Sequence, residues 1–71
     1  MAVKDIILKI LHDTYADSEA NALLDQDLLE HCKSQGLTDI DVIETELYSL
    51  IEKRLICYVD EGDGMLTFWL P

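Results

Sequence analysis

The chain has 71 residues, of which five are Lys or Arg and 15 are Asp or Glu, giving a formal net charge of −10. We expect one domain over residues 1–71, because this length leaves no room for a second core. The acidic balance argues against nucleic acids and anionic membrane surfaces, which are bound mainly through Lys and Arg. No apolar run is long enough to span a membrane and the first residues do not resemble a signal peptide, so we expect a cytoplasmic protein.

The first predicted element is an amphipathic helix over residues 3–16. Apolar residues recur every three or four positions from Val3 to Leu11, with Tyr15 as the last candidate, while charged residues occupy the other face. A polar connector follows at residues 17–21. The next apolar segment, residues 22–24, is too short for a helix and is predicted as a brief strand.

A second helix is predicted to begin at Asp25, a suitable N-cap residue, and to end at Gly36, which suits the left-handed position after a helix. Its inward side chains are Leu28, Leu29 and Cys32. Leu37 then provides a hydrophobic contact for the helix end.

A third helix follows, with Thr38 as its predicted N-cap and with Lys53 and Arg54 in its last turn, where cations suit the helix dipole. Its apolar residues are spaced by three, four, three and one, which predicts one buried face of a helix. They are Ile40, Ile43, Leu47, Leu50 and Ile51.

The end of the chain reads as a β-hairpin, with strands at residues 55–59 and 65–70 and turn residues at 60–64. Alternation along the second strand predicts that Leu66, Phe68 and Leu70 face inward. Met65, Thr67 and Trp69 would then face outward, with Tyr58 or Cys57 beside them depending on the register.

The order helix, short strand, helix, tight turn, helix and hairpin resembles the winged helix-turn-helix proteins. Residues 22–24, the turn at residues 36–38 and the wing entry at residues 54–56 carry the resemblance. It implies an α+β, mostly helical fold of three helices, with a short strand after the first helix and a C-terminal hairpin as the wing. A helical bundle with an appended hairpin is the alternative architecture.

The resemblance also implies that the exposed face of the third helix would enter the DNA major groove. Five of the seven residues predicted on that face are acidic and none is basic, which opposes contact with phosphate. They are Asp39, Asp41, Glu44, Thr45, Glu46, Ser49 and Glu52. This acidic face reads either as a solvated surface or as a docking surface for a basic partner.

The hairpin offers a second candidate interaction surface made of Tyr58, Met65 and Trp69, since large apolar side chains on an uncovered strand often mark an interface. A symmetric homodimer through the hairpin is the first hypothesis for such a surface. The alternative is that the first helix covers Trp69.

Catalytic and metal-binding signatures are weak. His31 and Cys32 are adjacent on a helix and point about 100° apart, so they do not chelate one metal by themselves. Residues 60–64 contain three carboxylates but lack the other ligands of a calcium loop, and they read better as a hairpin turn. We therefore expect no enzyme, no cofactor and no metal site.

The leading functional hypothesis is a small acidic protein–protein interaction module that does not bind DNA directly. The alternative is a DNA-binding domain of a transcriptional regulator that acts weakly or within a larger complex. The cations available for DNA contact would be Lys4, Lys9, Lys33, Lys53 and Arg54.

Overall fold

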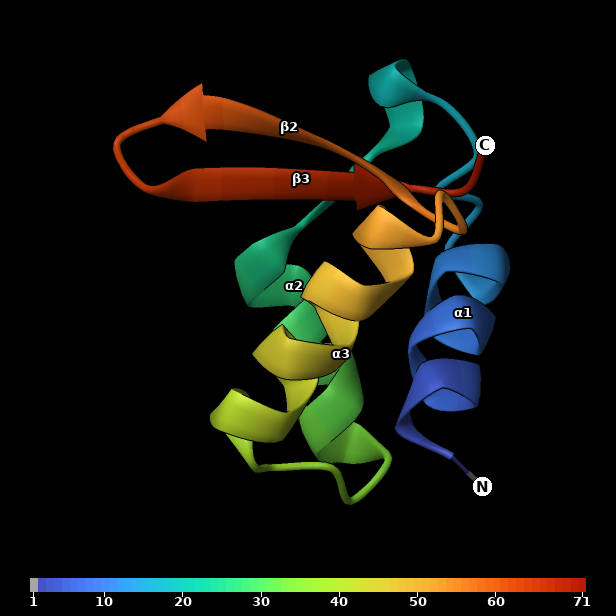
Figure 1. The fold of residues 1–71 in the computed structure, drawn as a ribbon, viewed down its shortest axis with the longest axis vertical. Coiled ribbons are helices and arrows are strands. Elements are labelled where there is room, and N and C mark those ends of the chain that lie inside the picture. Colours follow the sequence, from blue (N-terminus) through green and yellow to red (C-terminus); the bar gives the residue numbers. More distant parts are fainter. Residues whose placement is uncertain (1) are drawn as a thin grey trace.

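The computed structural model describes residues 2–71 and shows an α+β fold with three α-helices and a three-stranded antiparallel sheet (Figure 1). The predicted order of helix, short strand, two helices and hairpin is confirmed. The elements are α1 (Val3–Asp13), the 3₁₀-helix η1 (Glu19–Asn21), β1 (Leu23–Leu24), α2 (Asp25–Ser34), α3 (Ile40–Glu52), β2 (Cys57–Gly62) and β3 (Met65–Trp69). In the part of the chain described, no helix is both long and apolar enough to cross a membrane.

One hydrophobic core joins the three helices to the central strand of the sheet. The spacing of apolar residues places them on the inward stripe of each helix, as the sequence predicts. The fully or almost fully buried apolar residues are Ile7, Ile10, Leu11, Ala16, Leu28, Cys32, Ile43, Leu47, Leu50, Ile56 and Phe68. Phe68 is the largest of them. It lies on β3 and belongs to the same core cluster as the helix residues, so it connects the sheet to the helical layer.

The strand order is β1-β3-β2, which makes β3 the central strand. Phe68 is paired with Leu23 on one side and with Tyr58 on the other. The hairpin turns through Asp63 and Gly64, whose φ angles of 53° and 77° are both positive. Asp-Gly with two positive φ angles is the favoured two-residue hairpin turn, because its twist matches that of the strands. The predicted hairpin is therefore confirmed, but its turn is shorter than the predicted residues 60–64, because β2 continues through Gly62.

All three helices end in the same way, with one residue in the left-handed region followed by an amide that bonds five residues back. That residue is Gly36 after α2, but Tyr15 after α1 and Arg54 after α3, with φ angles of 85°, 59° and 60°. The closing N–O distances are 2.9 Å from Ala16 to Leu11, 2.8 Å from Leu37 to Cys32 and 2.9 Å from Leu55 to Leu50. Only the glycine was recognisable in the sequence.

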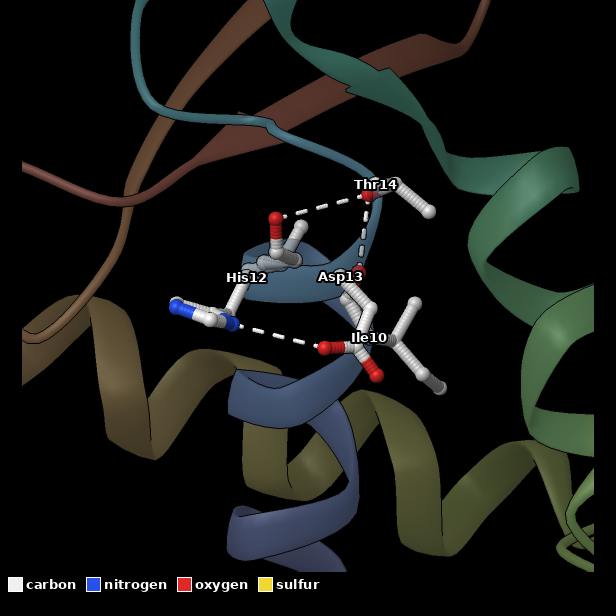
Figure 2. A network of polar contacts seen from close by, with 5 residues as sticks. Ile10, His12, Asp13 and Thr14 are labelled. Atoms are coloured by element: carbon white, nitrogen blue, oxygen red, sulfur yellow. Dashed lines mark hydrogen bonds and ion pairs between the residues drawn. The ribbon is translucent and has the colours of Figure 1, made fainter.

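The first helix is shorter than predicted, because α1 ends at Asp13 rather than at residue 16. Figure 2 shows this end, where the Thr14 hydroxyl donates a 2.8 Å hydrogen bond to the carbonyl oxygen of Ile10. Tyr15 was a candidate for the buried stripe, but its side chain is 79% exposed. The left-handed backbone at Tyr15 takes this residue out of the helical spacing that places Leu11 in the core.

Several predicted boundaries near α2 and α3 are wrong by one or two residues. The N-cap of α3 is Asp39, not Thr38, and its carboxylate accepts hydrogen bonds from the amides of Asp41 and Val42. Ile40 is therefore the first residue of the helix, and it is 53% exposed rather than buried, because the first turn extends beyond the core.

Other boundary shifts are smaller in consequence. Leu24, not Asp25, is the residue before α2, and it makes no side-chain cap. Lys53 is the C-cap of α3 and Arg54 lies beyond it, so neither is in the last turn. The first hairpin strand begins at Cys57 instead of at residue 55.

The two faces of the hairpin are covered by different parts of the chain. Figure 1 shows the three helices on one side of β2 and β3 and the segment containing η1, drawn in cyan, on the other. η1 contacts β3, and the Leu70 amide donates a 2.7 Å hydrogen bond to the Ala16 carbonyl oxygen. Thr67 lies on the outward face, as predicted, since it is one position along from the Tyr58–Phe68 pair, but it is only 6% exposed there, because η1 contacts β3 and strands flank it on both sides.

Candidate functional site

Residues of the predicted acidic face of α3 line two different hollows, one on each flank of the helix. Glu44 lies on the flank next to the hairpin, while Asp41, Thr45 and Glu46 line a hollow of about 290 Å³ on the flank next to Val3 of α1. The remaining predicted residues line neither hollow; Asp39 and Glu52 are exposed and Ser49 is partly exposed. The helix thus presents carboxylates around much of its circumference.

The larger hollow, which we call the hairpin groove, lies between α2, α3 and the helix-facing side of the hairpin. Its volume is about 440 Å³. It is lined by Asp25, Leu29, Glu44, Leu47, Tyr48, Ile51, Tyr58, Asp60, Gly64, Leu66 and Phe68. The hollow exists because the hairpin extends past the helical layer near its tip, so that the helices leave part of its inner face uncovered (Figure 1).

Two exposed tyrosines line the hairpin groove, each from a different element. Tyr48 projects from α3 and is 67% exposed, and Tyr58 projects from β2 and is 49% exposed. Tyr58 is the cross-strand partner of Phe68, so both side chains are on the helix-facing side of the sheet. We call the remaining apolar lining residues the floor; they are Leu29, Leu47, Ile51, Leu66 and Phe68.

The charged side chains that line the hairpin groove are all acidic. Asp25, Glu44 and Asp60 contribute carboxylates from three different elements, and no Lys, Arg or His lines the groove. Within residues 2–71 the one ion pair is between His12 and Asp13, on α1. The groove carboxylates are thus left without a cationic neighbour and create a negative potential over an apolar floor.

The second predicted surface, made of Tyr58, Met65 and Trp69, does not form a single face. Trp69 is opposite Cys57, one position along from the Tyr58–Phe68 pair, and so lies on the other side of the sheet from Tyr58. Trp69 is also partly buried against the core, whereas Met65 is 40% exposed near the hairpin tip. Only Tyr58 of these three lines the hairpin groove.

The cations considered for DNA binding are exposed and lie on separate elements. Lys4 and Lys9 belong to α1, and Lys33 lies near the end of α2. Lys53 and Arg54 follow the last residue of α3. None of them lines the hairpin groove or lies on the exposed face of α3.

The histidines and cysteines make no constellation for catalysis. His12 Nδ1 lies 3.3 Å from Oδ1 of its neighbour Asp13, and Figure 2 shows both side chains at the C-terminal end of α1. Burial raises the pKa of the Cys32 thiol, which keeps it protonated and unreactive. Among residues 2–71, no three His, Cys, Asp or Glu side chains gather in a way that would hold a metal ion.

Sequence reasoning missed most of the groove. Asp25 and Leu29 were assigned to helix capping and to the core, and Tyr48 was left out of the predicted site altogether. A large aromatic residue at an exposed helix position was the available signal at Tyr48. In the groove, residues of α2 lie beside hairpin residues about 30 positions later in the chain, and no local sequence pattern predicts this contact.

Comparison with known proteins adds no relative to this description. No family model, no curated protein and no solved structure matches the chain.

Proposed function

We propose that this protein is an acidic protein–protein interaction module that binds a basic partner through α3 and the adjoining hairpin. The observation that carries the proposal is the set of unpaired carboxylates on and beside α3, next to exposed tyrosines. Complementary charge would speed association with a basic partner, and the aromatic residues would supply buried contact area.

The same observation weighs against direct binding to DNA, although the element order resembles that of winged helix-turn-helix proteins. In such proteins the third helix approaches phosphates, and here that helix carries Asp39, Asp41, Glu44, Glu46 and Glu52 with no Lys or Arg within its bounds. Each carboxylate close to a phosphate would raise the free energy of the complex.

We also propose a reducing, cytoplasmic setting for this module. Both cysteines are free thiols in the structure, Cys32 within the core and Cys57 on β2. Free thiols are the usual state where glutathione and thioredoxin keep cysteines reduced.

The experiment that tests the proposed function compares three forms of the tagged full chain as bait: wild type, Glu44→Lys/Glu52→Lys and Glu19→Lys/Glu30→Lys. Both double variants change the net charge equally, but only the first alters α3. Basic proteins should be retained by the wild type and by the Glu19/Glu30 variant and lost from the Glu44/Glu52 variant. Equal retention by all three would refute the role of α3.

A second arm measures retention of the wild-type chain on immobilised duplex DNA at low ionic strength. We expect no retention. Retention that falls steeply with added salt would instead support the alternative of a DNA-binding regulator domain.

A further inference from the structure

We infer that the hairpin groove binds a segment of a partner protein that combines apolar anchor side chains with flanking Lys or Arg. This inference rests on the proposed function and adds the place of contact and the chemistry of the partner. Three features of the groove carry it: its floor, its tyrosines and its carboxylates.

The floor provides apolar surface that the fold does not cover. Leu29, Ile51 and Leu66 are each partly exposed where they line the groove, beside the buried Leu47 and Phe68. A volume of about 440 Å³ lies within the range of pockets that bind ligands. Apolar side chains of a partner would remove this surface from water, which is the main source of binding free energy.

The two tyrosines add aromatic contact area to this surface. Tyr48 and Tyr58 come from different elements, α3 and β2, so a segment seated on the floor would contact both. Tyrosine is enriched among residues that dominate binding energy, because its ring buries a large area and its hydroxyl tolerates a wet rim.

The charges determine what flanks the anchors. Asp25, Glu44 and Asp60 surround the floor without a cation among the lining residues. A partner without positive charge would desolvate these carboxylates and offer nothing in return, whereas Lys or Arg would pair with them. The partner segment is therefore both basic and apolar.

The same charges oppose a second copy of this chain as the occupant. Each copy has a formal charge of −10, and β2, an edge strand, carries Asp60, which lines the groove, and Glu61, which lies beside Thr67 on the other face of the sheet. Charged residues on an edge strand hinder edge-to-edge pairing.

The experiment begins with the full chain as bait for a displayed library of random peptides of about 12 residues, long enough to cross a groove of this size. Enriched peptides should contain large apolar residues flanked by Lys or Arg. The most enriched peptide is then synthesised, its Kd is measured by titration, and the amides it perturbs are mapped by NMR.

Variants then locate the peptide. Tyr58→Ala and the pair Glu44→Lys/Asp60→Lys should each weaken the Kd about tenfold or more, as loss of a central contact does. The charge-matched pair Asp41→Lys/Glu52→Lys, on α3 but outside the groove, should weaken binding less than the Glu44/Asp60 pair does, because its charges lie farther from the peptide. The matched control Glu19→Lys/Glu30→Lys, on neither α3 nor the groove lining, should change the Kd less than about threefold. Circular dichroism confirms that each variant folds.

The outcomes separate this inference from the proposed function. If no peptide is enriched, this inference falls, and the proposed function is decided by the bait experiment with the Glu44/Glu52 variant. If peptides are enriched but respond to the Asp41/Glu52 pair and not to the groove variants, the groove assignment falls and the interaction module stands. Enriched peptides without basic residues would also overturn it, as would a dimer in light scattering that Tyr58→Ala abolishes.

Discussion

The two faces of the hairpin differ in how much of each the rest of the chain covers, and only part of this difference was expected from the sequence. For the outer face the sequence left two alternatives, an exposed interface around Trp69 or cover by the first helix; in the structure η1 contacts β3 and Trp69 packs partly against the core. The inner face was expected to be covered by the helices, yet Tyr58 is 49% exposed beside a groove. The difference teaches that facing the helical layer and being buried are separate properties when a hairpin extends past that layer.

The largest expected effect contrasts two residues that are directly paired on the inner face. Phe68→Ala should lower the free energy of unfolding by about 3–5 kcal/mol, since Phe68 is almost fully buried. Tyr58→Ala should lower it by less than about 1 kcal/mol, since Tyr58 is half exposed. Urea unfolding measures both, and a similar loss at the two positions would show that the groove is closed in solution.

The second prediction concerns the outer face and uses Trp69, the one tryptophan in the chain. Its fluorescence should be blue-shifted and weakly quenched by acrylamide in the folded protein and should move to the red on unfolding. Trp69→Ala should lower the free energy of unfolding by about 2 kcal/mol, less than the loss for a fully buried aromatic residue. Emission like that of free tryptophan would instead favour the alternative of an open outer face and, with it, the hypothesis of a homodimer through that face.

The third prediction concerns the two non-glycine residues that have left-handed backbone at helix ends. Tyr15 precedes the segment that covers the outer face and Arg54 precedes β2, and both have positive φ angles. Because left-handed backbone is strained for residues with a Cβ, Tyr15→Gly and Arg54→Gly should each raise the free energy of unfolding by up to about 1 kcal/mol.

The control for these glycine variants is the third helix end, where glycine is already present. Gly36→Ala should lower the free energy of unfolding by about 1 kcal/mol, although its methyl group meets no other atom. Urea unfolding of the three variants tests the idea together. Destabilisation by both new glycines would show that the Tyr15 and Arg54 side chains contribute more than their backbone strain removes.

The smallest expected effects concern the two thiols. Cys57 is paired with Trp69 on the outer face and is partly exposed, while Cys32 is fully buried between the helices. Iodoacetamide should modify Cys57 in the folded protein and Cys32 only after unfolding, as mass spectrometry of the labelled chain would show. Equal labelling rates would indicate that the helical core opens as readily as the edge of the sheet.

The Cys32 thiol should also make the free energy of unfolding depend on pH. Burial raises the pKa of Cys32 above its ordinary value of 9.0, so at higher pH the unfolded chain releases a proton that the folded chain retains. The contribution to stability is complete below that value and declines as the pH rises toward the folded-state pKa. Urea unfolding of the wild type and of Cys32→Ala across this range should give a smaller loss with pH for the variant.

The sequence determined the parts of this protein that depend on neighbouring residues. Spacings of three and four gave the inward stripes containing Leu11, Leu28 and Leu50, while Asp63-Gly64 and Gly36 gave a hairpin turn and a helix end. These features follow from local backbone geometry and side-chain periodicity, which a short segment already contains. The acidic character of α3 belongs to the same class, since composition along one helix reveals it.

Only the tertiary structure decided which of these surfaces remain open. The hairpin groove joins Asp25, Tyr48 and Tyr58 from three elements, and the cover over β3 comes from η1, about 50 residues earlier in the chain. The left-handed helix ends at Tyr15 and Arg54 were likewise invisible, because neither residue type favours that conformation. Exposure is set by how far each layer extends over its neighbour, and that depends on the packing of the whole chain rather than on any stretch of it.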